Sequence, residues 1–212
     1  NNLYIIDNSQ DVYKSTDSGA TWTVINGTDF NNNNGDVRGI ALNNSNYLFT
    51  VDNKADVWYS LDGITWILAK DDYNEGDDND ATAITIDTND NLFILYEKDV
   101  WKSEDSGTTW TKVNDSYGNN NGKVIISDEN NNLYIIDNSQ DVYKSTDSGA
   151  NWIVINDSDF NGGNGNVLGI AQFDISTNLS LYTHSCNDPN CDDETWSGPY
   201  TNSTLTTLSE AN

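Results

Sequence analysis

The chain has 212 residues, of which 34 are acidic and nine are basic, so its net charge at neutral pH is −25. This charge disfavours nucleic acids and anionic membranes as partners, because binding to either requires a basic protein surface. Hydrophobic residues make up only 35% of the chain, but seven Trp and eleven Tyr predict a core built from few, large side chains. No apolar run approaches the roughly 18 residues that a membrane-spanning helix needs, so membrane insertion is not expected.

Five similar units follow one another along the chain. Each reads as short strands separated by Asp, Asn, Ser and Gly, and no unit shows the apolar period of a helix. Within a unit, an apolar run such as LYIID precedes an apolar–aromatic pair such as Val12-Tyr13, and a Trp follows. We place the units at 204–212 with 1–26, 36–70, 81–114, 122–156 and 165–200.

An eight-residue phrase that ends with the Trp recurs in the first four units, once in a shortened form. It reads STDSGATW at 15–22, SLDGITW in shortened form at 60–66, SEDSGTTW at 103–110 and STDSGANW at 145–152. Ser and Asp can bond the amides of a tight turn, and Gly can adopt positive φ, so the phrase predicts a hairpin whose Trp begins the returning strand. The structural residues of these hairpins are Asp17, Trp22, Asp62, Trp66, Asp105, Trp110, Asp147 and Trp152.

This phrase resembles the Asp box, or BNR repeat, of sialidase-like β-propellers, whose pattern is Ser-x-Asp-x-Gly-x-Thr-Trp. The resemblance implies that the box lies between the third and fourth strands of a blade, at its outer edge. The fold class we expect is all-β, a five-bladed β-propeller of four-stranded antiparallel blades. Sialidases of the family bind the sugar carboxylate with three arginines, and because Arg38 is the only arginine here, sialidase activity is not expected.

The two ends of the chain match a continuous internal segment. TTLSEAN followed by NNLYIID resembles residues 124–137, and residues 1–26 differ from 131–156 only at Thr21/Asn151 and Thr23/Ile153. We therefore expect 204–212 to pair with the N-terminal blade and close the ring. The alternative is a module of a longer tandem array, and the absence of Met indicates processing or a longer precursor.

The fifth unit replaces the box with a pair of cysteines. Cys186 and Cys191 in CNDPNC favour a small disulfide loop over free thiols, which indicates an oxidising, extracellular setting. A zinc site is disfavoured because His184 is the only histidine. A Ser-His-Asp site around His184 has no accompanying nucleophile motif, so we expect a surface histidine.

The loop DDYNEGDDND at 71–80 suggests calcium. Ca²⁺ takes six to eight oxygen ligands, and closely spaced carboxylates and carbonyls suit it, although no EF-hand pattern is present. The alternative is a solvated acidic loop without an ion. The expected ligands are Asp71, Asp72, Asp77, Asp78 and Asp80.

Two further sets of residues are candidates for surface roles. The loop tyrosines Tyr73, Tyr117 and Tyr200 are candidates for ligand contact, whereas the Trp and Tyr residues at fixed places in the repeat are expected between blades. Glycosylation is possible at six sequons, a number no higher than the composition predicts by chance. These are Asn26, Asn43, Asn114, Asn156, Asn178 and Asn202.

The function we predict is an extracellular, non-enzymatic structural or adhesive module that binds calcium. Near-identical internal repeats are typical of repetitive surface proteins, so the expected partners are identical or tandem copies, assembled in a filament if the contacts do not close. A carbohydrate-binding propeller that recognises glycans is the second hypothesis. A glycoside hydrolase with paired carboxylates is the third, and the abundance of acids makes such pairs uninformative.

Overall fold

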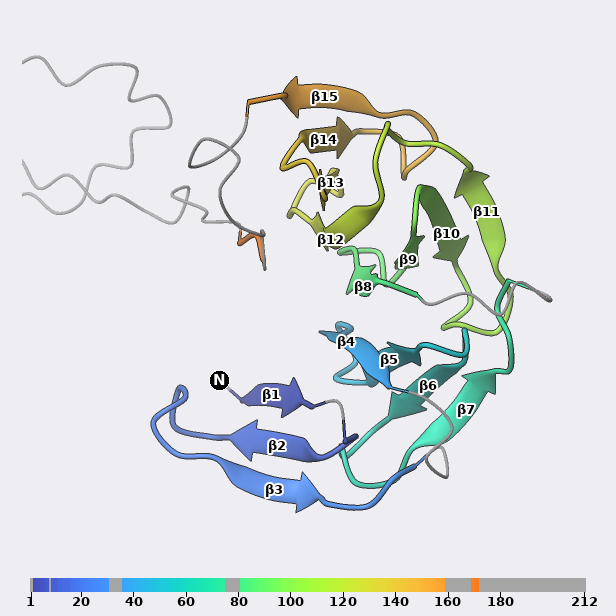
Figure 1. Cartoon of the computed structure of the whole chain (residues 1–212). Coiled ribbons are helices and arrows are strands. Elements are labelled where there is room, and N and C mark those ends of the chain that lie inside the picture. Colours follow the sequence, from blue (N-terminus) through green and yellow to red (C-terminus); the bar gives the residue numbers. More distant parts are fainter. Residues whose placement is uncertain (1, 8, 31–35, 75–80, 159–168, 172–212) are drawn as a thin grey trace, which may run out of the picture. The chain divides into compact units, whose positions relative to one another are not determined.

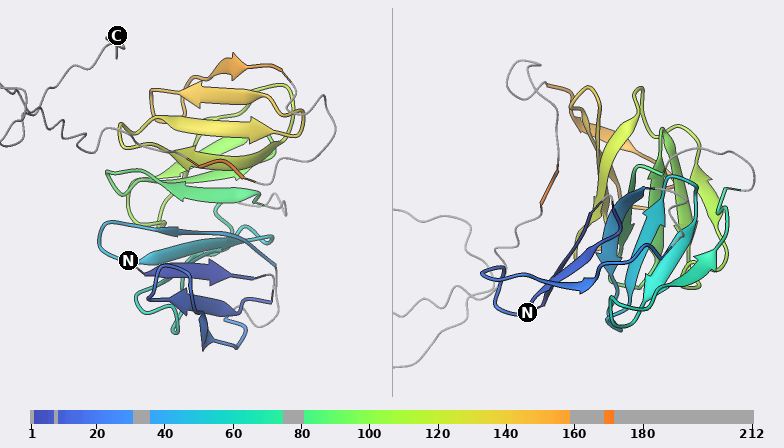
Figure 2. Two further views of the ribbon diagram at one scale, coloured as in Figure 1. Left: turned by 90° about the vertical axis from the view of Figure 1, so that its left-hand side faces the viewer. Right: turned by 60° about the horizontal axis from the view of Figure 1, so that its bottom comes forward.

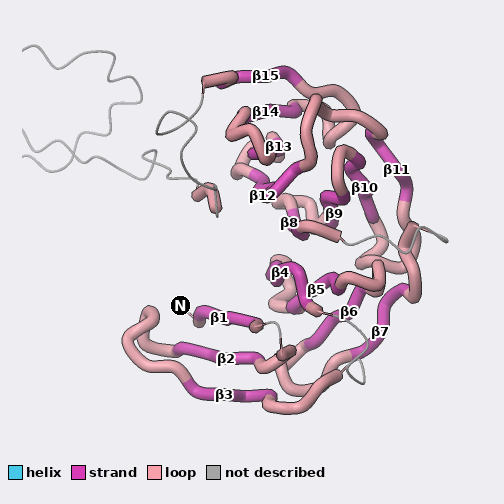
Figure 3. Tube along the Cα trace, in the orientation of Figure 1, coloured by secondary structure: helices cyan, strands magenta, loops and turns pink. Residues whose placement is uncertain are grey.

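A computed structural model of the chain describes residues 2–7, 9–30, 36–74, 81–158 and 169–171. The chain divides into two compact units, Asn1–Ala171 and Gln172–Asn212, and the second lies entirely outside the described residues. The predicted closing strand at 204–212 and nearly all of the predicted fifth blade therefore lie outside the described residues. The described residues contain strands and loops but no helix (Figure 3).

The described strands form four antiparallel sheets in strict chain order, which we number 1 to 4. Sheet 1 contains β1 (Leu3–Ile6), β2 (Val12–Ser15) and β3 (Thr23–Asn26). Sheet 2 contains β4 (Val37–Leu42), β5 (Leu48–Asp52), β6 (Val57–Ser60) and β7 (Ile67–Lys70). Sheet 3 contains β8 (Ala83–Ile86), β9 (Leu92–Tyr96), β10 (Asp99–Ser103) and β11 (Thr111–Asn114). Sheet 4 contains β12 (Gly122–Ser127), β13 (Leu133–Asp137), β14 (Val142–Ser145) and β15 (Ile153–Asn156).

The sheets stack face to face in the order of the sequence, as the colours in Figure 2 show. On the inner side, the first strand β8 contacts the first strands β4 and β12 of its two neighbours, and the last strands β7, β11 and β15 lie on the outer side (Figure 1). In β9, Leu92 and Ile94 pack in the core shared with sheet 2, whereas Phe93 and Leu95 pack in the core shared with sheet 4. Both faces of an inner strand are therefore buried, which explains why these strands read as apolar runs.

The apolar–aromatic pair of each repeat marks a bulge. The strands of sheet 1 correspond to the last three strands of sheet 4, β13, β14 and β15. Its β2–β3 pairing, equivalent to the pairing of the third and fourth strands elsewhere, shifts register between Val12 and Tyr13. The same shift falls at the equivalent pairs, Val57/Trp58, Val100/Trp101 and Val142/Tyr143. A bulge increases the local twist of a strand, so each sheet turns its outer strand at the same point.

In sheets 1, 2 and 4, the turn that leads into the strand before the box is held by one aspartate. In sheet 4, Asp137 Oδ1 accepts hydrogen bonds from the amides of Ser139 and Asp141 at 2.8 and 3.0 Å. Asp7 and Asp52 make the equivalent pairs of bonds in sheets 1 and 2. Much of the acidic composition is thus used in side-chain-to-backbone turns, because carboxylates are good acceptors for the amides that a turn leaves unpaired.

Candidate functional site

The recurring box forms the predicted hairpin between the third and fourth strands of every sheet. In sheet 4, Ser145 Oγ donates to Asp147 Oδ1 at 2.9 Å and accepts from the Gly149 amide at 3.0 Å. Asp147 also accepts from the amide and the side-chain Nδ2 of Asn151, at 2.8 and 2.7 Å. The Trp152 Nε1 donates to the Gly149 carbonyl at 2.8 Å. All of these partners lie within the hairpin, so the box is a self-contained turn.

These hydrogen bonds favour the ionised carboxylate. In sheet 1, bonds from the Thr21 side chain and amide, together with one from Ser15, lower the pKa of Asp17 to about 2. The pKa of Asp147 is lowered for the same reason, chiefly by Asn151. The box carboxylates are therefore charged structural acceptors and unsuitable as general acids at neutral pH.

The box glycine is also the point where one sheet receives its neighbour. A Cβ at Gly149, whose φ is +85°, would lie 3.3 Å from both Val100 and Val113 of sheet 3. Gly107 faces Val57 and Ala69 of sheet 2, and Gly63 faces Ile25 of sheet 1. The glycine is thus required both by its left-handed backbone and by the close approach of the preceding sheet.

The expectation that Tyr73 and Tyr117 contact a ligand is wrong. Tyr73 is 1% exposed and packs against Trp101 and Trp110, with ring centroids 5.6 Å apart in both pairs. Tyr117 is 4% exposed and packs in the same way against Tyr143 and Trp152. Burial raises the pKa of both tyrosines. They are part of the core between sheets.

The sequence contained the signal for this burial. Phe30 occupies the position in the first loop that Tyr73 and Tyr117 occupy in the next two, and it stacks on Trp66 at 4.8 Å. A ring that recurs once per repeat, as Phe or Tyr, indicates packing rather than recognition. The third tyrosine of this prediction, Tyr200, lies outside the described residues.

The acidic loop is only partly described. Asp71 is exposed, Asp72 is half-buried and donates its amide to Asp56 Oδ1 at 3.0 Å, and Asp77, Asp78 and Asp80 lie outside the described residues. Burial, assisted by the charges of Asp52 and Asp71, raises the pKa of Asp56 to about 6. Within the described ranges, no three His, Cys, Asp or Glu side chains are grouped so that they could hold a metal ion.

The remaining predicted residues divide between described and undescribed parts of the chain. Asn26 is buried and its Nδ2 donates to the Ile64 carbonyl at 3.0 Å, while Asn114 donates to the Ala150 carbonyl at 2.9 Å, so both tie one sheet to the next. Asn43 and Asn156 are half-buried. Cys186, Cys191, His184, Asn178 and Asn202 lie outside the described residues. In the part of the chain that is described, no helix is long and apolar enough to cross a membrane.

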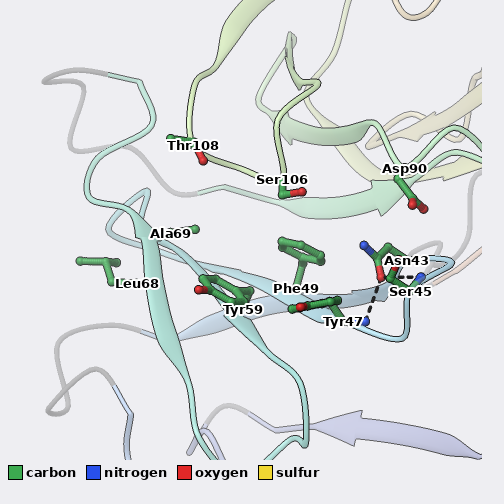
Figure 4. A pocket seen from close by; sticks show the side chains of 10 residues that line it. All are labelled: Asn43, Ser45, Tyr47, Phe49, Tyr59, Leu68, Ala69, Asp90, Ser106 and Thr108. Carbon is green, nitrogen blue, oxygen red and sulfur yellow. Dashed lines mark hydrogen bonds between the residues drawn. The ribbon is translucent and has the colours of Figure 1, made fainter.

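A groove between sheets 2 and 3 is the best candidate for a binding site (Figure 4). Its volume is about 520 Å³. Its floor consists of three aromatic rings, Tyr47 immediately before β5, Phe49 in β5 and Tyr59 in β6. The ring of Tyr59 lies 6.1 Å from each of the other two. Strand periodicity places Tyr47 and Phe49 on the same face, and Phe49 is paired directly with Tyr59 across the sheet.

Polar groups surround this aromatic floor. Ser106 and Thr108, from the box hairpin of sheet 3, form the opposite wall, and Asn43 and Asp90 lie at one end (Figure 4). The Asn43 side chain is fixed, because its Oδ1 accepts from the amides of Ser45 and Tyr47 at 3.1 and 2.8 Å. An apolar floor with a few fixed polar groups is the usual composition of a ligand site.

This groove was not among the sites predicted from the sequence, although the repeat contains a signal for it. The positions of Tyr47 and Tyr59 are held by Asn91 and Lys102 in sheet 3, and by Asn132 and Lys144 in sheet 4. The fold therefore does not require an aromatic ring at either position. An equivalent groove of about 420 Å³ lies between sheets 3 and 4, and there Lys102 and Glu104 line it.

Comparison with known proteins supports the fold and no more. No protein-family model and no curated protein sequence matches this chain. Among solved structures, a nidogen/laminin complex aligns at a TM-score of 0.57 with 16% identity over 72% of this chain and 60% of that one. YCF48 bound to D1 peptide aligns at 0.56 with 11% identity over 71% and 50%. An ancestral GH74 enzyme aligns at 0.52 with 22% identity over 71% and 22%.

These similarities establish a β-propeller fold. The chain spans between a fifth and three fifths of the length of these three structures, and the identities are too low to transfer an activity. One of the three is an enzyme, and the other two are a complex with D1 peptide and a nidogen/laminin complex, which illustrates that this fold serves different functions.

Proposed function

We propose that this chain is an extracellular, non-enzymatic structural or adhesive propeller module that associates with further copies of itself. The net charge of −25 is unsuited to nucleic acid and anionic membrane. Many of the carboxylates in the described residues hold turns, and those of the box are fixed in their ionised form. Two of the similar structures, YCF48 bound to D1 peptide and the nidogen/laminin complex, agree with a role in protein binding.

The observation that carries the proposal is the apolar surface of two outer strands. In β7, Ile67 and Leu68 are 46% and 41% exposed, and in β15, Ile153 and Val154 are 63% and 48% exposed. Both are edge strands of their sheets within the described residues. An edge strand presents unpaired amides and carbonyls, and apolar side chains beside them favour pairing with another chain.

Sheet 3 shows how the same position is protected. Its outer strand β11 carries Thr111 and Lys112 where β7 carries Ile67 and Leu68. Lys112 forms an ion pair with Asp99 at 2.6 Å and lies 5.1 Å from the centre of the Trp101 ring. A lysine at an edge opposes association between strands, because pairing would bury its charge. Sheets 2 and 4 have no such lysine at this position.

Ring closure by the chain's own C-terminal residues is part of the proposal. Sheet 1 has three described strands, and its β1 corresponds to β13, the second strand of sheet 4. Leu3, Ile5 and Trp22 are exposed on the face of sheet 1 away from sheet 2. We assign 204–212 to the missing first strand and 165–200 to a fifth blade that covers this face.

Calcium binding is a further part of the proposal. Asp56 has a raised pKa because it is buried beside other carboxylates, including Asp71 of the acidic loop. A bound cation would reduce this repulsion. We expect Ca²⁺ to raise the melting temperature of the chain and EDTA to lower it, and an identical melting temperature in both would contradict the calcium role.

Self-association is tested with the full chain by sedimentation velocity over a range of concentrations. We expect the wild type to associate and the triple variant Ile67→Thr, Ile153→Thr, Val154→Lys to stay monomeric. Each substitution copies the residue of an equivalent strand, Thr111, Thr23 or Lys112, so the melting temperature should change little. A wild type that stays monomeric, or a variant that associates equally, would overturn the proposed assembly.

A further inference from the structure

We propose that the groove between sheets 2 and 3 binds an ammonium group, in the form of a lysine side chain from a protein partner. Leu68 of β7 belongs both to this groove and to the outer-strand surface, but the inference does not depend on self-association. It follows from a difference between sheet 2 and the other three sheets.

Each of the other sheets places its own lysine over the aromatic ring of the second strand. Lys14 lies 5.4 Å from the centre of the Tyr4 ring, Lys102 lies 5.8 Å from Phe93, and Lys144 lies 5.3 Å from Tyr134. In each case the two residues pair directly across the second and third strands. The repeat therefore builds one cation–π contact per sheet.

Sheet 2 retains the ring and lacks the cation. Phe49 occupies the place of Phe93, but its cross-strand partner is Tyr59 instead of a lysine. Tyr47 adds a third ring where the other sheets carry Asn. Phe49 itself is buried, at 1% exposed, but Tyr47 and Tyr59 beside it are half-buried on the floor of the groove, and a cation from outside can interact with these two rings.

The charges at the groove favour a cation over a neutral or anionic ligand. Asp90 is half-buried at one end of the groove, and its Oδ1 accepts from the Asn44 amide at 2.9 Å, which fixes the carboxylate (Figure 4). Among the described residues that line the groove, Asp90 is the only charged one. The net charge of −25 adds a long-range attraction for a basic partner.

The size of the groove agrees with a flexible basic side chain. Leu68 and Ala69 line it together with the rings, so the aliphatic stem of a lysine has apolar surface to cover. Ser106 and Thr108 offer hydroxyl oxygens, which can accept hydrogen bonds from an ammonium group.

The test is a titration of the full chain by NMR or calorimetry with small lysine derivatives. The probes are N-acetyl-lysine methylamide and its ε-trimethylated form, and the matched control is N-acetyl-norleucine methylamide, which has a similar stem but no charge. We expect both lysine probes to bind, and norleucine to bind about tenfold more weakly or not at all. Equal binding of norleucine, or binding of a neutral hexose oligosaccharide in place of the lysine probes, would overturn the proposal.

Variants that copy the other sheets locate the site. Tyr59→Lys gives sheet 2 the internal lysine of its neighbours and should weaken binding about tenfold without a loss of folding. Asp90→Asn keeps the acceptor for Asn44 and should weaken binding a few-fold. Lys102→Tyr should strengthen binding by opening the equivalent groove between sheets 3 and 4, where Glu104 supplies a carboxylate. Unchanged binding in both Tyr59→Lys and Asp90→Asn would place the lysine elsewhere and refute the assignment.

Discussion

Residues 1–26 and 131–156 have almost the same sequence but different surroundings. Both fold into a three-stranded meander with the same register and the same box hairpin. Leu133 and Ile135 are both 0% exposed, whereas the equivalent Leu3 and Ile5 are 42% and 46% exposed. The local sequence therefore determines the strands and turns, and the neighbouring sheet determines which side chains become buried.

On the other face of the two segments, the first segment is the one whose side chains are covered. Ile25 of the first segment packs close to Gly63 of sheet 2, whereas the equivalent Ile155 is half exposed. Sheet 1 thus lacks a neighbour on one side and sheet 4 lacks one on the other, among the described residues. Between these two segments, each pair of neighbouring sheets is joined by contacts of these same two faces, which is why the proposed fifth blade at 165–200 is expected to fit both.

The largest expected effect comes from truncating the leucine that differs most between the segments. Leu133→Ala should lower the free energy of unfolding by about 3 kcal/mol, because it leaves a cavity between sheets 3 and 4. If the proposed fifth blade at 165–200 covers sheet 1, Leu3→Ala in the full chain should cost about the same. Both are measured by urea denaturation of the full chain. A cost near zero for Leu3→Ala would show that the face is open and would contradict ring closure.

A second effect should be equal in the two segments whatever covers them. Asp147→Ala removes the acceptor for Ser145 and for both donors of Asn151, and we expect it to cost about 2 kcal/mol. Asp17→Ala removes the same bonds from Ser15 and Thr21 and should shift the urea midpoint to a similar extent. The control is Asn151→Thr, which copies Thr21 and should be neutral. A large difference between the two Asp variants would mean that the box depends on the neighbouring sheet.

The distinction between what the local sequence determines and what the neighbouring sheet determines also explains how much the sequence could predict. The strands, the box hairpin and the order of the four described sheets follow from local pattern, and the structure confirms each. The burial of Tyr73 and Tyr117 and the groove around Tyr47 and Tyr59 depend on which residues meet across two sheets. A single repeat does not encode that contact. An alignment of the repeats, position by position, identifies Tyr73 and Tyr117 as packing residues. It identifies Tyr47 and Tyr59 as departures from the repeat.

The smallest expected effect concerns Asp56, the counterpart in sheet 2 of Asp11 and Asp141 in the two segments. Burial raises the pKa of Asp56 from its ordinary 3.8 to about 6, so the folded state favours the protonated form. Its contribution to stability is present below about pH 4 and is lost as the pH rises through about 6. Asp56→Asn keeps the acceptor for the Asp72 amide and avoids the buried charge.

We therefore expect Asp56→Asn to raise the free energy of unfolding at pH 7 by about 1 kcal/mol, a value reduced for the partial exposure of the site. At pH 4 the variant and the wild type should be equal, and the difference between them is measured by urea denaturation at both values. Saturating Ca²⁺ should remove the difference at pH 7 if an ion neutralises this carboxylate. A variant that is less stable than the wild type at pH 7 would mean that the charge of Asp56 stabilises the loop. A cation would then have to lie near Asp56 in addition to the carboxylates of Asp52 and Asp71.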